Sequence, residues 1–146
     1  MSVVNINKEL YKQQVKDEKK VVLAEFWAPW CVYCKRIGPA YKKIAEEYGD
    51  KLVVGQINID EEQELAVENN IEVVPSLILY KDGQAVGNLV APESKAKIEA
   101  FIKEHAKCYI SDIEEGDYFV DNNGFRWVVV LIAAAIIIGL VWYYFS

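Results

Sequence analysis

Apolar residues follow two different spacings along the first hundred residues of the chain. Short β-branched or apolar runs predict β-strands at residues 3–6, 21–28, 52–59, 77–80 and 85–90. Apolar residues three and four positions apart predict helices at residues 8–16, 31–48, 61–68 and 92–107. Asn7 and Asp60 are expected to cap the first and third of these helices, and Pro92 to occupy the first turn of the last. The predicted order is therefore β-α-β-α-β-α-β-β-α.

This order predicts an α/β fold with a mixed central sheet and helices on both faces, over residues 1 to about 106. Strands that alternate with helices favour parallel pairing. The Asp82-Gly83 step between the last two strands predicts a hairpin, which adds an antiparallel edge. The run 21–28 suits a strand that is buried on both faces, although Glu25 interrupts it.

The last part of the chain has a different pattern. Residues 127–145 are nineteen residues without a charge, and as a helix they would span about 28 Å, close to the hydrocarbon thickness of a bilayer. Trp127 at one end and Trp142, Tyr143 and Tyr144 at the other are typical of membrane interfaces. We expect one C-terminal transmembrane helix here. The alternative is a buried strand of a hairpin that turns at Asn123-Gly124.

Residues 107–126 separate these two parts. They carry five acidic residues against two basic ones and predict an acidic linker, with a small hairpin as the alternative because apolar residues lie among the charged ones. Cys108 in this stretch is open to three interpretations: an idle thiol, a third redox thiol or a lipidation site. Arg126 lies on the domain side of the apolar run, and the N-terminus shows no signal-peptide pattern. Both observations favour a cytoplasmic domain.

Composition limits the function further. The chain has 146 residues, a formal net charge of −6 and a pI of about 4.9, so nucleic acid is not an expected partner. Three cysteines in a chain of this length do not form a disulfide framework.

Two of the three cysteines, Cys31 and Cys34, have Cys-x-x-Cys spacing at the predicted start of a helix. Unpaired N–H groups and the helix dipole stabilise a thiolate at that position, and the second thiol lies one turn further on the same side. This arrangement suits dithiol–disulfide exchange. The other interpretation, half of a zinc site, needs two more ligands, and only Cys108 and His105 are available elsewhere. We therefore expect no metal.

With its motifs in order, the chain resembles the thioredoxin family over about its first 106 residues. The motifs are Phe26-Trp27-Ala28-Pro29-Trp30-Cys31, Cys34-Lys35, Pro39, Asn58-Ile59-Asp60, Val74-Pro75-Ser76 and Lys81-Asp82-Gly83. The resemblance implies a thioredoxin-like fold in which Cys31 attacks and Cys34 resolves. It also implies a cis Pro75 facing the disulfide, backbone hydrogen bonds from Val74 to a substrate strand, and shielding of the site by Trp30.

Glu25 occupies the place where the family usually has a buried aspartate beside the resolving cysteine. A carboxylate buried behind a thiol pair is expected to have a raised pKa, through desolvation and thiolate repulsion. It could then accept the proton of Cys34 during the resolving step. The alternative is a solvated strand residue with no chemical role.

Two positions depart from the family. Val32 and Tyr33 stand between the cysteines, where thioredoxins typically have Gly-Pro, and they change access to the start of the helix. Ala91 stands where the family often has glycine in the loop that faces the substrate, so its methyl group is expected to restrict how closely partner proteins dock.

The sequence thus predicts a membrane-anchored thiol–disulfide oxidoreductase that reduces protein disulfides without a bound cofactor. A thioredoxin-reductase-like donor would regenerate the Cys31–Cys34 pair. One alternative keeps the chemistry but places the domain outside the cytoplasm, where it would oxidise or isomerise exported proteins. The other is a non-enzymatic binding module with the same fold.

Overall fold

The structure is a computed structural model that describes residues 2–106. They belong to the first of two units of the chain, Met1–Ile110 and Ser111–Ser146. Within the described residues, no helix is long and apolar enough to cross a membrane. The predicted linker at 107–126, Cys108 and the predicted transmembrane helix at 127–145 lie outside the described residues.

Five strands form one mixed sheet in the order β1-β3-β2-β4-β5. The strands are β1 (Val4–Asn5), β2 (Val22–Trp27), β3 (Val53–Asn58), β4 (Ser76–Lys81) and β5 (Gln84–Val90). The helices are α1 (Lys8–Tyr11), the π-helix η1 (Lys12–Asp17), α2 (Val32–Tyr48), α3 (Gln63–Glu68) and α4 (Lys95–His105). The predicted thioredoxin-like α/β fold, with a mixed sheet between helices, is therefore confirmed for this part of the chain.

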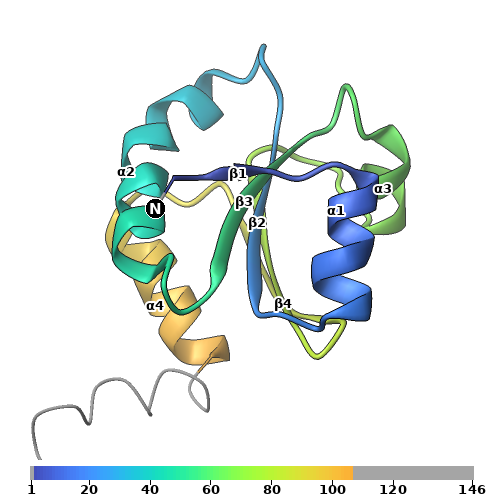
Figure 1. The fold of residues 1–146 in the computed structure, drawn as a ribbon. Helices are drawn as coiled ribbons and strands as arrows, with labels where there is room; N and C mark the ends of the chain where they lie inside the picture. Colours follow the sequence, from blue (N-terminus) through green and yellow to red (C-terminus); the bar gives the residue numbers. More distant parts are fainter. Residues whose placement is uncertain (1, 107–146) are drawn as a thin grey trace, which may run out of the picture. The chain divides into compact units, whose positions relative to one another are not determined.

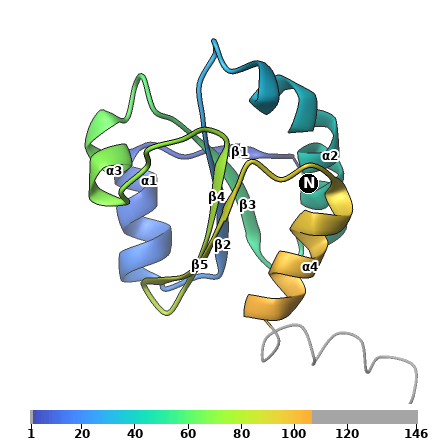
Figure 2. The ribbon, with the colours of Figure 1, turned by 180° about the vertical axis from the view of Figure 1, so that it is seen from behind.

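The helices form two layers around the sheet. Helices α2 and α4 cover one face, and α1, η1 and α3 cover the other (Figures 1 and 2). Side chains of β2 alternate between the two faces, as they must in a strand. Leu23 packs in the core with α2 and α4, whereas Val22, Ala24 and Phe26 pack in the core on the side of α1 and α3. The same alternation places Glu25 on the α2 face of the sheet.

The prediction of parallel pairing between alternating strands holds for β1, β3 and β2 but is wrong for β4, which runs antiparallel to β2. The reason is the length of α3. Six helical residues span about 9 Å, less than half the roughly 20 Å of a six-residue strand. The chain therefore does not return to the far end of the sheet, and β4 begins at the end where β2 and β3 finish.

Helix starts agree only in part with the sequence pattern. Asn7 caps α1 as predicted, and its side chain accepts the amide proton of Leu10. The helix continues as the π-helix η1, in which the amide of Glu18 donates to the carbonyl of Gln13. Helix α3 begins at Gln63, so the prediction that Asp60 caps it is wrong.

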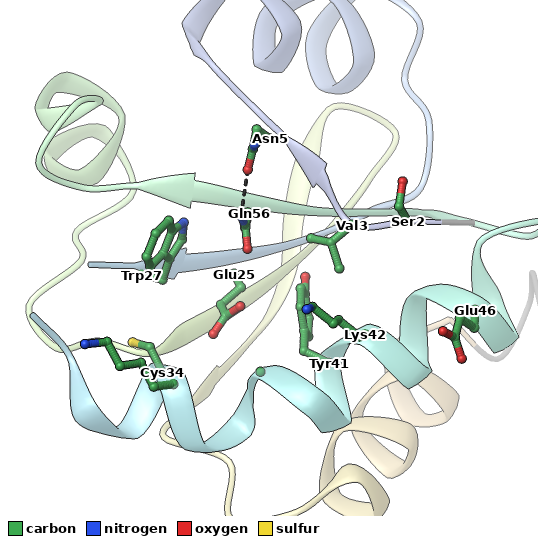
Figure 3. Close-up of a pocket in the computed structure, with 12 residues that line it drawn as sticks. Ser2, Val3, Asn5, Glu25, Trp27, Cys34, Tyr41, Lys42, Glu46 and Gln56 are labelled. Atoms are coloured by element: carbon green, nitrogen blue, oxygen red, sulfur yellow. Dashed lines mark hydrogen bonds between the residues drawn. The ribbon is translucent and has the colours of Figure 1, made fainter. Parts of the chain in front are cut away.

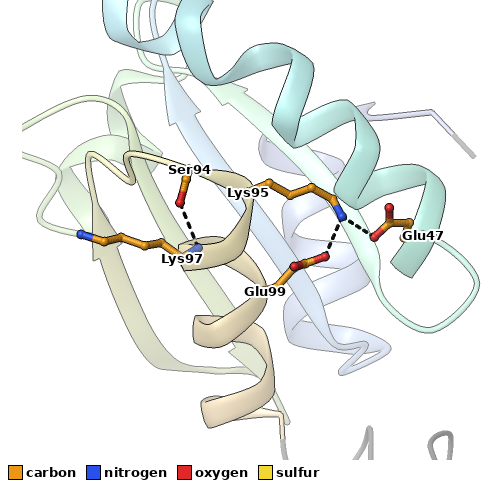
Figure 4. Close-up of polar contacts among 5 residues, drawn as sticks. All are labelled: Glu47, Ser94, Lys95, Lys97 and Glu99. Atoms are coloured by element: carbon orange, nitrogen blue, oxygen red, sulfur yellow. Dashed lines mark hydrogen bonds and ion pairs between the residues drawn. The ribbon is translucent and has the colours of Figure 1, made fainter.

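The prediction that Pro92 occupies the first turn of the last helix is also wrong, because α4 begins at Lys95 after the cap Ser94. The hydroxyl oxygen of Ser94 accepts a hydrogen bond from the amide of Lys97 and so caps the helix. The side chain of Pro92 has no acceptor that could form this bond. The ammonium of Lys95 then bridges α4 to α2, at 2.7 Å from Glu99 and 2.6 Å from Glu47 (Figure 4).

The predicted hairpin between β4 and β5 is confirmed. Lys81 pairs with Gln84, and both residues between them have positive φ angles, 54° at Asp82 and 80° at Gly83. Two consecutive residues in this region characterise a type I′ turn, which Asp-Gly favours.

Candidate active site

Cys31 and Cys34 lie at the start of α2 and form a disulfide. Cys31 is the N-cap of the helix, with an extended backbone, and its Sγ accepts the amide proton of Cys34 at 3.1 Å. Once the disulfide is reduced, the same N–H group and the helix dipole favour a thiolate on Cys31. Both side chains are largely buried, and they pack with Ala28 in a small cluster beside Val74.

The loop before β4 brings Pro75 to this disulfide. The Val74–Pro75 peptide is cis, Pro75 is buried, and the carbonyl oxygen of Val74 lies 3.7 Å from Sγ of Cys31. This approach follows from the topology, because β4 starts at the end of the sheet where β2 leads into α2. Ala91 joins the loop through its amide, which donates to the carbonyl of Pro75 at 2.8 Å. Its φ of 44° lies in the left-handed region that favours glycine.

Exposed apolar side chains stand beside the disulfide. Trp30 and Val32 keep 65% and 66% of their surface exposed, Tyr33 keeps 51%, and Val73 precedes the proline loop at 53%. The guanidinium carbon of Arg36 lies 5.1 Å from the centre of the Tyr33 ring, a cation–π contact that steadies the ring. Large exposed apolar side chains grouped around a reactive bond are typical of a surface that binds another protein.

Asp60 is a site residue that the sequence analysis missed. Its carboxylate accepts a hydrogen bond from the indole nitrogen of Trp30 at 3.3 Å. This bond holds the ring that is expected to shield the disulfide. Its place at the end of β3 could have signalled this role, because β2 and β3 are parallel and their carboxyl ends meet at one edge of the sheet.

Glu25 lies in the middle of the sheet, and only 3% of its surface is exposed. Burial raises the pKa of its carboxyl group from 4.5 to about 7. Within residues 2–106, its Oε1 atom has no hydrogen-bond partner. The neighbouring Tyr41 hydroxyl is engaged elsewhere, 2.7 Å from the carbonyl oxygen of Gly55 and 3.0 Å from that of Leu23.

A cavity of about 700 Å³, which we call the α2 cavity, lies between α2 and the sheet. Glu25 and Cys34 both line it, together with Trp27, Gly38 and Tyr41. Figure 3 shows the Glu25 side chain extending from β2 toward α2, between Cys34 and Tyr41. Lys42 and Glu46, which are exposed residues of α2, also line the cavity, so it connects the interior to solvent. The structure thus places the buried carboxyl and the second cysteine at one space.

The structure brings together every site residue that the sequence analysis named: Glu25, Trp30, Cys31, Val32, Tyr33, Cys34, Val74, Pro75 and Ala91. The first six lie on β2, at the start of α2 and in the loop between them, and the last three on the loops that flank β4 and β5. Across residues 2–106, no three His, Cys, Asp or Glu side chains gather in a metal-binding group. The reactive group of this site is the disulfide between Cys31 and Cys34.

Comparison with known proteins gives one consistent family. The thioredoxin family model matches residues 2–104. The chain is 37% identical to a thioredoxin of Buchnera aphidicola subsp. Baizongia pistaciae over 105 residues, which are 72% of this chain and 96% of the relative. It is 34% identical to a thioredoxin of Bacillus subtilis, again over 105 residues, 72% of this chain and 99% of the relative.

Among solved structures, the crystal structure of the Malassezia sympodialis thioredoxin Mala s 13 is similar. It superposes with a TM-score of 0.65 at 33% identity, and the match covers 73% of this chain and 93% of that one. The match to the family model ends at residue 104, so it does not include the apolar run at 127–145.

Proposed function

Because the chain belongs to the thioredoxin family and has the disulfide oxidoreductase pair Cys31–Cys34, we propose that it reduces disulfide bonds of other proteins at a membrane. The observation that supports this proposal most directly is the hydrogen bond from the amide of Cys34 to Sγ of Cys31. It favours a thiolate on the first cysteine, and a thiolate is the species that attacks a disulfide.

The proposed cycle has two exchange steps. The thiolate of Cys31 attacks one sulfur of the substrate disulfide, and the other substrate sulfur leaves as a thiolate. The thiolate of Cys34 then attacks Sγ of Cys31, which forms the intramolecular disulfide and releases the second substrate thiolate. Two electrons pass to the substrate. A dithiol donor of the thioredoxin-reductase type returns them to the Cys31–Cys34 pair, and no bound cofactor takes part.

The proposed role of Glu25 belongs to the second step. Cys34 must lose its proton before it attacks, and it lies largely buried at the α2 cavity, beside the carboxyl group of Glu25. A pKa of about 7 lets this carboxyl both accept and release a proton at neutral pH. Val74 and Pro75, with the exposed side chains of Trp30, Val32 and Tyr33, would hold the substrate segment, and the methyl group of Ala91 would limit its approach.

The direction of the reaction is tested by the reduction potential of the Cys31–Cys34 pair, measured by equilibration with glutathione. We expect a value near the roughly −270 mV of thioredoxin, because a reductant must hold its electrons at a lower potential than the disulfides it reduces. A value of about −180 to −120 mV would contradict the proposal. It would favour the oxidase or isomerase alternative instead.

The membrane part of the proposal rests on sequence alone. The uncharged run at 127–145 has the length of a bilayer span, and Arg126 and Lys107 lie on the side of the thioredoxin domain. The positive-inside rule then favours a tail anchor with the domain in the cytoplasm. Anchoring would raise the effective concentration of the domain near membrane proteins.

Topology can be measured with an impermeant maleimide and a Glu104→Cys variant whose three native cysteines are replaced by serine. Residue 104 is exposed on α4, so the thiol is accessible in the fold. We expect no labelling of intact cells and full labelling after lysis. The same background without Glu104→Cys is the control for unspecific labelling. Labelling of intact cells would place the domain outside and contradict the cytoplasmic assignment.

A further inference from the structure

We propose that Tyr33 and Arg36 form a subsite for an acidic residue of the substrate protein, beside the disulfide that is to be reduced. The inference rests on the proposed function and deepens it, since it names the class of substrate that the Cys31–Cys34 pair prefers. Substrates of this class carry aspartate or glutamate close to one of their disulfide-bonded cysteines. The exchange steps themselves are unchanged.

Arg36 is held beside the reactive pair by its contact with Tyr33. The two residues lie three positions apart on α2, and therefore on neighbouring turns of the same side of the helix. The guanidinium carbon of Arg36 lies over the Tyr33 ring, 5.1 Å from its centre. Tyr33 itself precedes Cys34 in the chain, and about half of its surface is exposed. The contact therefore places a positive charge at the rim of the site before any substrate binds.

The N–H groups of the Arg36 guanidinium are available to a bound partner. Arg36 is exposed, and within residues 2–106 it forms neither an ion pair nor a side-chain hydrogen bond. A guanidinium that lies over an aromatic ring can still donate from its edge, and two parallel N–H groups match the two oxygens of a carboxylate. An acidic side chain is therefore the ligand that fits this position.

The charges of α2 run against the preference of a helix. Residues 32–45 include four basic side chains and no acidic one, whereas Glu46 and Glu47 follow near the C-terminal end. The helix dipole favours the opposite order, with acidic residues near the N-terminus and basic residues near the C-terminus. The stability of α2 thus does not account for basic residues at the end that carries the disulfide.

Positive charge near Cys31 has a second effect, which the experiment must separate from substrate binding. Lys35 and Arg36 favour the Cys31 thiolate through their charge, and this changes the rate of attack on every disulfide alike. A subsite instead raises the rate for acidic substrates alone. The quantity to measure is therefore the preference for an acidic over a neutral substrate, and not the rate itself.

Acidic residues of the protein lie on the other side of the site. Asp60, which accepts a hydrogen bond from Trp30, is followed by two glutamates before α3 begins. Helix α3 covers the face of the sheet opposite to α2 (Figures 1 and 2). An acidic substrate residue is thus attracted on the side of α2 and repelled on the side of α3. Since backbone pairing with Val74 would fix the direction of the substrate chain, only one flank of its cysteine faces Arg36.

The test uses three peptides that differ only in the two residues on each side of a central cysteine, which forms a mixed disulfide with thionitrobenzoate. One has glutamine at all four positions, one has two glutamates before the cysteine, and one has two after it. Two residues per side are needed because successive side chains of an extended segment point to opposite sides. Cys31 attacks the peptide sulfur, the S–S bond breaks, and the coloured thionitrobenzoate thiolate leaves, so its release gives the rate of attack.

The full-length reduced protein is used in a neutral detergent, with Cys108→Ser so that no third thiol reacts. Each rate is divided by that of the same peptide with dithiothreitol, which corrects for the reactivity of the disulfide itself. We expect one acidic peptide to react about fivefold faster than the glutamine peptide, and the other no faster. Equal rates for all three peptides, or an equal gain for both acidic ones, would overturn the subsite. No reaction with any peptide would instead contradict the proposed function.

Variants of α2 assign the preference to its residues. Arg36→Gln should abolish the preference for the acidic peptide, and Arg36→Lys should keep only about twofold of it, because lysine retains the charge but not the paired N–H groups. The matched control is Lys43→Gln, which removes the same charge from an exposed position two turns further along the same side of α2 and should keep the full preference. Full preference in Arg36→Gln or Arg36→Lys, or its loss in Lys43→Gln, would overturn the proposal.

Discussion

A Cys31→Ser variant should reduce insulin disulfides no faster than dithiothreitol does without the protein. Serine keeps the size and the N-cap position of Cys31, but its hydroxyl is not ionised at neutral pH and does not attack a disulfide. The start of α2 and the amide of Cys34 would then stabilise no nucleophile. Turbidity from precipitating insulin chains measures the loss directly.

Cys34→Ser is the matched control, because it replaces a cysteine sulfur by a hydroxyl in the same way, one helical turn further along α2. Cys31 keeps its environment in this variant and still attacks, but the mixed disulfide is not resolved. We expect stable adducts between the protein and insulin chains on a non-reducing gel, and none with Cys31→Ser. Adducts in Cys31→Ser alone would mean that the two cysteines have the opposite roles.

The second large effect concerns Glu25 and the pH dependence of stability. The pKa of its carboxyl is about 7 in the folded protein, against 4.5 when exposed, so between these values the folded state binds more protons than the unfolded state. The free energy of unfolding therefore falls as the pH rises from 4.5 through 7. The difference corresponds to about 3 kcal/mol from this one group.

Urea unfolding of the oxidised protein at several pH values measures this effect. The difference in unfolding free energy between the wild type and Glu25→Leu should change by about 3 kcal/mol from pH 4.5 to 7.5, with the wild type losing stability. Glu25→Gln removes the same titrating group. Its unfolding free energy should therefore change with pH as that of Glu25→Leu does, although the two variants differ in absolute stability. Parallel curves for all three proteins would show that Glu25 does not titrate in this range.

The sequence predicts the strands well because their signal is local. Residues 21–28 are predicted to form a strand that is buried on both faces. In the structure, β2 is the central strand of the sheet, with a neighbouring strand on each side. The direction of β4 is not predicted correctly, because it depends on how far α3 carries the chain. The sequence pattern predicts a longer helix at this place, over residues 61–68, than the six residues of α3. The starts of α3 and α4 were predicted from Asp60 and Pro92. Both residues can begin a helix, but α4 begins later because Ser94 caps it, and α3 begins only at Gln63.

The reactive pair and its surroundings were also visible in the sequence, since Cys31 and Cys34 form a local motif and Pro75 a second one. What the sequence left open was whether Glu25 is solvated or buried; the structure has it buried. For Asp60 the sequence offers only its place after a predicted strand, and for Gly38 it offers no signal, because their surroundings depend on what lies across a loop or under a helix. A hydrogen bond to Trp30 and an open space beside Cys34 are properties of the assembled fold.

The alternation of side chains along β2 also has a consequence for how the chain finds its fold. A shift of β2 by one residue against its neighbours would turn every side chain to the opposite face of the sheet. Glu25 would then point among Ile57, Leu65 and Ile78, in a core on the far side from the α2 cavity. A carboxyl group in such apolar surroundings is strongly unfavourable. The acidic residue proposed to serve the redox reaction therefore also helps to fix the register of β2, because a sheet with β2 shifted by one residue would be less stable.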